Sequence, residues 1–199
     1  MSATGRGAER AEYDSYHTPD ALALTLTRRL AADFCLQPRT VLEPSVGGGA
    51  FVRAVRSVWG ERPYVAGVDI QDVPGCGADG VTRCDFLAHP PVEPGLARRP
   101  GLIIGNPPFC EAEPHTRHAL SFRPPGGVVA FLLRLAFLES KARVPFWQEN
   151  RPARVYVLSE RPSFTGGGTD SCAYGFFVWQ EGHSGATAMD WVYSWKGAE

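Results

Sequence analysis

The chain has 199 residues, of which 44% are hydrophobic and 21% are charged, and its net charge is −1 with an isoelectric point near 6.5. This length and composition fit one globular domain with a full core, and the longest apolar run is too short to span a membrane. The near-neutral charge excludes a protein whose whole surface is basic, so any contact with nucleic acid needs local basic residues.

Composition also bears on domain organisation and compartment. Residues 1–12 are small and charged and predict a disordered tail without a secretory signal, and residues 13–199 predict a single domain without a separate recognition domain. Five cysteines with no Cys-x-x-Cys pair favour reduced thiols in a cytoplasmic protein. The spacing of Cys110, His115 and His118 matches no common zinc pattern, so no metal site is expected.

The first predicted helix covers residues 21–34, where leucine or phenylalanine recurs every four residues from Leu22 to Phe34. We expect Thr18 to cap this helix and Pro19 to stand in its first turn. Residues 40–59 then predict a strand, a glycine-rich turn and a second helix.

The glycine-rich turn contains three consecutive glycines, Gly47 to Gly49, after a strand that ends on Glu43. The glycines would allow a ligand to approach the backbone, and the following helix N-terminus would offer free N–H groups. The motif is not the spaced Gly-x-Gly-x-x-Gly of dinucleotide sites, and the negative charge of Glu43 suits a cationic ligand better than a diphosphate.

Two further strands end on carboxylates. The strand predicted at residues 64–70 ends on Asp69, which is placed to accept both hydroxyls of a ribose. Residues 71–80 are rich in proline and glycine and leave little room for a helix before the strand predicted at residues 81–87, which carries Asp85 and Phe86. With Glu43, three successive strands therefore present an acid at the same edge of the predicted sheet.

The next strand, at residues 102–105, is a short apolar run typical of a strand buried on both faces. Asn106-Pro107-Pro108-Phe109 follows, and the two prolines force a stiff extended turn with its carbonyls held out. The Asn106 side-chain oxygen and the Pro107 carbonyl could each accept one N–H of an exocyclic amine and direct its lone pair at an electrophile, while Phe109 stacks on the ring.

Beyond residue 110 the chain alternates again between helices and strands. Helices are predicted at residues 113–122 and 138–150, the second kinked or split at Pro145. Strands are predicted at residues 127–135, 154–159 and 173–179, and residues 187–193 could add one more. The whole pattern predicts an α/β three-layer sandwich with a Rossmann-like, mostly parallel seven-stranded sheet and an antiparallel C-terminal strand.

These motifs, in this order and at strand ends, resemble those of class I S-adenosylmethionine-dependent methyltransferases. The resemblance rests on Glu43-Pro-Ser-Val-Gly47, Asp69, Asp85-Phe86 and Asn106-Pro-Pro-Phe109, preceded by Tyr16-His-Thr-Pro19. The Asn-Pro-Pro-Phe form is similar to adenine-N6 DNA methyltransferases, and the short length is similar to stand-alone enzymes of phage and prophage type.

The resemblance implies S-adenosyl-L-methionine as cofactor, with Glu43 near its ammonium, Asp69 on its ribose and Asp85 with Phe86 at its adenine. The cofactor-binding residues implied are Tyr16, Thr18, Pro19, Glu43, Pro44, Gly47, Gly49, Asp69, Ile70, Asp85, Phe86 and Asn106. The catalytic residues implied are Asn106, Pro107, Pro108 and Phe109. Phe109 and Phe164 would contact the target base.

The implied reaction is methyl transfer to the N6 amine of adenine in DNA, from which the base would have to be flipped out. The same chemistry would serve an RNA base, cytosine N4 or a protein glutamine amide, and a catalytically silent binding subunit is a third alternative. Because no recognition domain is predicted, sequence choice would fall to loops 110–125 and 161–172 or to a partner. Local phosphate contacts could come from arginines such as Arg117, Arg123 and Arg154.

Overall fold

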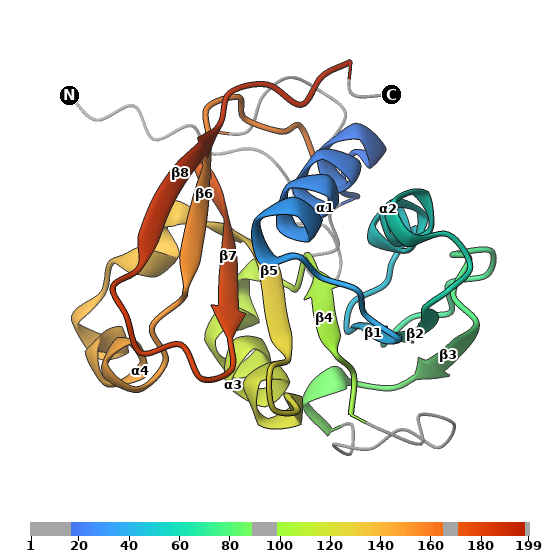
Figure 1. Cartoon of the computed structure of the whole chain (residues 1–199), viewed down its shortest axis with the longest axis horizontal. Helices are drawn as coiled ribbons and strands as arrows, with labels where there is room; N and C mark the ends of the chain where they lie inside the picture. The colour runs from blue at the N-terminus through green and yellow to red at the C-terminus, as the bar shows by residue number, and fades with distance from the viewer. Residues whose placement is uncertain (1–16, 89–98, 165–170, 198–199) are drawn as a thin grey trace.

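A computed structural model describes residues 17–88, 99–164 and 171–197 of the chain. Its centre is an eight-stranded sheet in the order β3-β2-β1-β4-β5-β7-β6-β8 (Figure 1). The strands are β1 (Thr40–Glu43), β2 (Tyr64–Asp69), β3 (Gly80–Arg83), β4 (Leu102–Gly105), β5 (Val128–Arg134), β6 (Arg154–Leu158), β7 (Tyr174–Gln180) and β8 (Ala188–Val192). The predicted α/β fold with a mostly parallel sheet is therefore confirmed.

Strand β7 is antiparallel to both of its neighbours, β5 and β6, whereas every other pairing in the sheet is parallel. The sheet has one strand more than the seven predicted, because residues 187–193 do contribute β8. This last strand pairs in parallel with β6 and not with β7, its predecessor in the chain. The antiparallel strand is thus the penultimate one.

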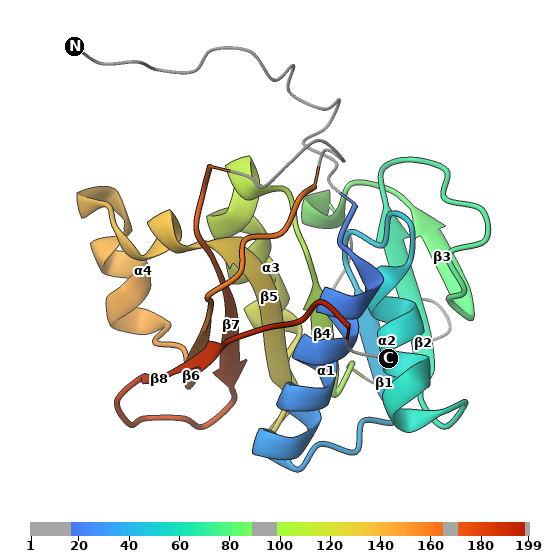
Figure 2. The ribbon, with the colours of Figure 1, turned by 90° about the horizontal axis from the view of Figure 1, so that it is seen from above.

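Helices cover both faces of the sheet, as Figures 1 and 2 show. The helices α1 (Asp20–Phe34) and α2 (Ala50–Trp59) lie on one face, and α3 (Ala112–Phe122) and α4 (Val144–Glu149) lie on the other. Each face has its own hydrophobic core, and alternate residues of a strand enter different cores because successive side chains point to opposite faces. Leu102 and Ile104 pack with α1 and α2, whereas Ile103 packs with α3.

Two local predictions were wrong. Thr18 does not cap α1, because the cap position is Pro19 and no side chain caps it; Thr18 Oγ1 instead accepts a hydrogen bond from Asn106 Nδ2 at 3.1 Å. The helix predicted at residues 138–150 is shorter, because residues 135–138 and 141–143 form 3-10 turns and α4 begins only at Val144; Pro145 therefore stands in its first turn and neither kinks nor splits a longer helix. Proline in a first helical turn loses no hydrogen bond, which explains its place there.

Other predictions of local structure hold, and some fall outside the described residues. No helix lies between β2 and β3 in the described chain, as the proline- and glycine-rich composition of residues 71–80 indicated. The predicted tail at residues 1–12 lies outside the described residues. Within the described residues, the longest helix has 15 residues, and none is long and apolar enough to cross a membrane.

Candidate functional site

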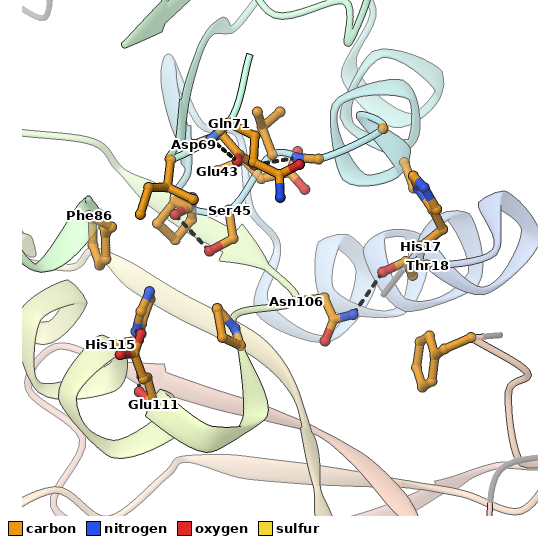
Figure 3. Close-up of a pocket in the computed structure, with 18 of the residues that line it drawn as sticks. His17, Thr18, Glu43, Ser45, Asp69, Gln71, Phe86, Asn106, Glu111 and His115 are labelled. Carbon is orange, nitrogen blue, oxygen red and sulfur yellow. Dashed lines mark hydrogen bonds and ion pairs between the residues drawn. The ribbon is translucent and has the colours of Figure 1, made fainter. Parts of the chain in front are cut away.

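A cavity of about 1020 Å³ opens at the carboxyl ends of β1, β2 and β4, where the parallel strands bring their last residues to one edge (Figure 3). Most of the residues predicted to form a site line this cavity. They are Thr18, Pro19, Glu43, Pro44, Gly47, Asp69, Ile70, Asp85, Phe86, Asn106, Pro108 and Phe164.

Three predicted residues do not line the cavity, and one is outside the described chain. Pro107 is buried beneath the turn, and Phe109 points into an aromatic group described below. Gly49 has a positive φ of 75°, and a Cβ at this position would overlap the carbonyl of Cys76, so this glycine allows the turn to pack against a neighbouring loop. Tyr16 lies outside the described residues.

Glu43 ends β1 at the base of the cavity, where its side chain is buried. Burial raises the pKa of this carboxyl well above its usual value, although the backbone N–H of Val52 and the charge of Arg53 oppose the shift. Its Oε2 atom has no hydrogen-bond partner among the described residues. A buried acceptor with an open position is suited to a cationic donor from a ligand.

Asp69 ends β2, and its two carboxylate oxygens are fixed by the backbone. Oδ2 accepts the Gly47 N–H at 2.8 Å, and Oδ1 accepts the Gln71 N–H at 2.9 Å. Each oxygen retains a further lone pair, so the carboxylate can still accept hydroxyl groups of a ligand that enters the cavity.

Three N–H groups of the glycine-rich turn and of the helix that follows it already have acceptors within the protein. The Gly47 N–H is bound to Asp69, the Gly49 N–H donates to the Val46 carbonyl at 2.8 Å, and the Val52 N–H donates to Glu43. The turn therefore uses its donors to hold the two carboxylates and itself. A diphosphate cradle of the kind that such turns often form is not available at these three groups.

The far end of the cavity is partly apolar. Phe86 is buried and its ring centroid lies 5.5 Å from that of His115 on α3, and the Asp85 carboxylate accepts the Leu87 N–H at 2.9 Å. Burial lowers the pKa of His115 to about 4, so the imidazole is neutral near pH 7. An aromatic ring, a neutral imidazole and a nearby carboxylate together fit a planar, polar heterocycle.

Asn106 directly follows β4 and stands at the cavity wall. Its Nδ2 donates to Thr18 Oγ1, which ties the end of β4 to the segment before α1. Figure 3 shows the amide nitrogen facing Thr18 and the amide oxygen on the other side. This hydrogen bond fixes which way the amide lies, so Oδ1 is the atom directed away from Thr18.

Phe109 belongs to an aromatic group beside the cavity. Its ring centroid lies 5.8 Å from that of Phe164 and 5.3 Å from that of Tyr174, and the Arg134 guanidinium lies 4.9 Å from its ring centre. The two aromatic residues predicted to meet a target base, Phe109 and Phe164, are therefore neighbours, although only Phe164 reaches the cavity itself.

Sequence reasoning missed several lining residues that come from helices and loops. The polar or charged ones are His17, Asp20, Arg53, Gln71, Glu111, His115 and Ser163. His17, Asp20 and Gln71 each adjoin a predicted motif residue, so proximity to a motif was the available signal. Arg53, one helical turn beyond the glycines, had no such signal.

No protein-family model matches the chain, and no curated protein matches it in sequence. Many solved structures share its fold. A Listeria monocytogenes protein assigned to the class I S-adenosylmethionine-dependent methyltransferases superposes with a TM-score of 0.69 at 15% identity, over 96% of this chain and 69% of that one.

Two subunits of restriction-modification systems are also similar. The methyltransferase subunit of a type I system from Streptococcus thermophilus gives a TM-score of 0.64 at 16% identity, and the M protein of the type I restriction enzyme EcoKI gives 0.61 at 16%. They match 85% and 87% of this chain, which spans 45% of each subunit. The chain thus has the class I methyltransferase fold.

Proposed function

We propose that this protein is an S-adenosylmethionine-dependent methyltransferase that acts on the exocyclic N6 amine of adenine in DNA. The observation that carries the proposal is the position of Asn106-Pro107-Pro108, which leaves β4 at the edge of the cavity into which Glu43 and Asp69 project. An amine acceptor and a set of groups suited to the cofactor thus meet in one cavity. The similarity in fold to type I restriction-modification methyltransferase subunits supports DNA as the substrate.

The residues of the cavity fit the proposed cofactor. S-adenosylmethionine supplies, when bound, a methyl group on a positively charged sulfonium. The open position beside buried Glu43 Oε2 suits the ammonium of its methionine part, and the fixed carboxylate of Asp69 suits the ribose hydroxyls. Phe86 and His115 suit the adenine ring.

In this proposal, Asn106 Oδ1 and the Pro107 carbonyl each accept one N–H of the target amine. The two acceptors localise the nitrogen lone pair and direct it at the methyl carbon. The new N–C bond would form as the C–S bond to the sulfonium breaks, and one amine proton would pass to water. Thr18 acts by holding the Asn106 amide in the orientation that presents the oxygen. Phe109 and Phe164 would hold the flipped base by stacking.

Three of the arginines that the sequence suggested for phosphate contacts are paired with carboxylates in the structure. Arg117 pairs with Glu113 at 3.0 Å, Arg123 with Glu181 at 3.1 Å, and Arg154 with Asp33 at 2.7 Å. Each partner occupies donors and lowers the local net charge, so these three pairs are weaker evidence for a phosphate track than unpaired arginines would be.

The test is transfer of labelled methyl from S-adenosylmethionine to duplex DNA, single-stranded DNA, total RNA and protein extract, followed by nucleoside and amino-acid analysis. We expect label as N6-methyladenine in DNA and none with Asn106→Ala. Label in an RNA base, at cytosine N4 or in glutamine would support methyl transfer to an amine but would show that the substrate is not adenine in DNA. Cofactor binding without transfer to any substrate would instead favour a silent binding subunit.

A further inference from the structure

The charge balance of the cavity points to a residue with no role so far. Five carboxylates line the cavity, and Arg53 is the one lysine or arginine among its described lining residues. The carboxylates are Asp20, Glu43, Asp69, Asp85 and Glu111. Such a cavity suits the two positive groups of S-adenosylmethionine but repels its one carboxylate. We propose that Arg53 binds the carboxylate of the methionine part, an inference that rests on the proposed cofactor.

The position of the guanidinium fits this role. Arg53 is in the first turn and a half of α2, and its Nη1 donates to the Gly48 carbonyl at 2.6 Å, which places it on the glycine-rich turn. Its Nη2 and Nε donate to Asp20 Oδ1 at 2.6 and 3.2 Å. The guanidinium therefore bridges the glycine-rich turn and the start of α1, and its charge acts on the Glu43 carboxyl.

Arg53 also retains donors for a ligand. A guanidinium has five N–H groups, and three of them serve Gly48 and Asp20 in the described structure. The two that remain, one on each terminal nitrogen, are enough to bind a carboxylate. Half of the Arg53 side chain and about two thirds of the Asp20 side chain are exposed, so a ligand can reach this pair without opening the core.

Part of the backbone near the glycine-rich turn is already occupied. The N–H groups of Gly47, Gly49 and Val52 already donate to groups within the protein. A ligand carboxylate would therefore find its charged donor in Arg53. Because charge-assisted hydrogen bonds are stronger than neutral ones, loss of this donor has a measurable cost.

The experiment compares two ligands that differ only in the carboxylate. Calorimetry measures the affinities of S-adenosylhomocysteine and of S-adenosyl-3-thiopropylamine, its decarboxylated form, for the wild type and Arg53→Gln. We expect Arg53→Gln to weaken S-adenosylhomocysteine about tenfold and the decarboxylated ligand less than about twofold. Arg53→Lys keeps the positive charge but loses the planar pair of N–H donors of the guanidinium, so we expect the affinity for S-adenosylhomocysteine to fall about threefold.

Two variants separate a binding role from a structural one. Asp20→Asn removes the ion pair but leaves the guanidinium, and we expect S-adenosylhomocysteine affinity to hold or rise because a competing anion is lost. If Arg53 only tied α1 to α2, Asp20→Asn would lose affinity as Arg53→Gln does. Arg62→Gln is the matched control, because this exposed arginine bonds Gln37 away from the cavity and should change neither affinity.

The outcomes for this inference and for the proposed cofactor are distinct. If the wild type binds neither ligand, the proposed cofactor is wrong and the inference fails with it. If the wild type binds both ligands equally, or if Arg53→Gln keeps the full preference for S-adenosylhomocysteine, the role of Arg53 is wrong while the proposed cofactor stands. Thermal unfolding of each variant confirms that the compared proteins are folded.

Discussion

The two halves of the cavity edge are built in different ways. The carboxylate half, made of Glu43, Asp69 and Asp85, follows β1, β2 and β3, and each carboxylate accepts at least one backbone N–H. The aromatic half consists of Phe109, Phe164 and Tyr174, whose rings pack on one another. Backbone hydrogen bonds hold the carboxylates of the first half, whereas the rings of the second half pack on one another.

Under the proposed function, this difference indicates separate roles for the two halves, cofactor binding for the carboxylate half and substrate binding for the aromatic half. A ligand in the carboxylate half meets groups that are already held in position and loses little conformational entropy on binding. A planar group that stacked in the aromatic half would have to replace contacts among Phe109, Phe164 and Tyr174. Asn106 lies between the two halves and, in the proposed reaction, touches only the amine. Substitutions on either side of Asn106 should therefore separate cofactor binding from substrate binding.

The largest effect is expected for Asn106→Ala. Loss of one preorganised acceptor should lower the single-turnover rate of methyl transfer by about 10²- to 10³-fold. S-adenosylhomocysteine affinity should change less than about threefold, because the acceptor serves the amine and not the cofactor. Rapid-quench assays with labelled cofactor measure the rate, and calorimetry measures the affinity.

Thr18→Val is the companion variant for Asn106. It removes the hydroxyl that accepts from Asn106 Nδ2 but leaves the asparagine, so we expect a smaller fall in rate, about tenfold. Parallel losses of rate and cofactor affinity in Asn106→Ala would contradict the assigned role and place this residue in the cofactor site.

The next effect concerns the carboxylate half. Asp69→Ala removes the acceptor of the Gly47 and Gln71 N–H groups together with the proposed ribose contact, so S-adenosylhomocysteine affinity should fall about 30-fold. Asp79→Ala is a matched control, because Asp79 accepts the Val65 N–H at the opposite end of β2, outside the cavity. Equal losses for both variants would show that β2 as a whole, and not the Asp69 carboxylate, supports binding.

Glu43 gives a prediction with two opposite pH dependences. Its pKa is raised in the folded protein above the usual value of 4.5, so the folded state binds more protons than the unfolded one. The contribution of Glu43 to the free energy of unfolding is therefore favourable below pH 4.5 and is lost as the pH rises through the raised pKa. Over the same range S-adenosylhomocysteine affinity should increase, because the ionised carboxylate attracts the ammonium.

Glu43→Gln isolates these terms from other titrating groups such as His115. The wild type should gain stability relative to Glu43→Gln as the pH falls, and it should bind S-adenosylhomocysteine about tenfold more tightly than the variant above the raised pKa. Denaturant unfolding and calorimetry at matched pH values measure both. A constant difference in affinity at every pH would contradict an ionised Glu43 in the complex.

The carboxylate half was predictable from the sequence because topology alone brings it together. Strands ending on Glu43 and Asp69 were predicted from apolar runs, and the carboxyl ends of parallel strands meet at one edge of a sheet. The third strand, predicted at residues 81–87, ends at Arg83, and Asp85 follows it just before a 3-10 turn at Phe86–Ala88. The short apolar segment at residues 102–105 likewise predicted a central strand, and β4 is buried on both faces. Most of the fold follows from the same reasoning.

The remaining features depend on packing between elements, which local patterns do not encode. The sequence around Thr18 predicts a helix cap, but the Thr18 hydroxyl accepts a hydrogen bond from Asn106, which is 88 residues away along the chain. His115 and Arg53 reach the cavity only because α3 and α2 turn those faces towards it. The parallel pairing of β8 with β6 could not be predicted from the sequence either, because a strand usually pairs with its neighbour in the chain, which here is β7.

The smallest effect is expected in the aromatic half. If the target base stacks on Phe109, Phe109→Leu should raise the KM for DNA about fivefold with little change in kcat or in S-adenosylhomocysteine affinity, because leucine keeps the apolar contact but loses the ring. Phe109→Tyr keeps the ring and should retain the wild-type KM. Steady-state assays measure these constants with unmethylated DNA of the kind that accepts the label in the transfer assay.

Phe164→Leu decides whether the aromatic half is a binding surface or only a packed group. Phe164 is buried and its ring contacts both Phe109 and Tyr174, so this variant should lower the free energy of unfolding by about 1 kcal/mol whatever its function. If it also raises the KM for DNA while Phe109→Leu does not, the base stacks on the ring that lines the cavity. If neither variant changes the KM, aromatic packing serves stability, and the base must be held by other groups.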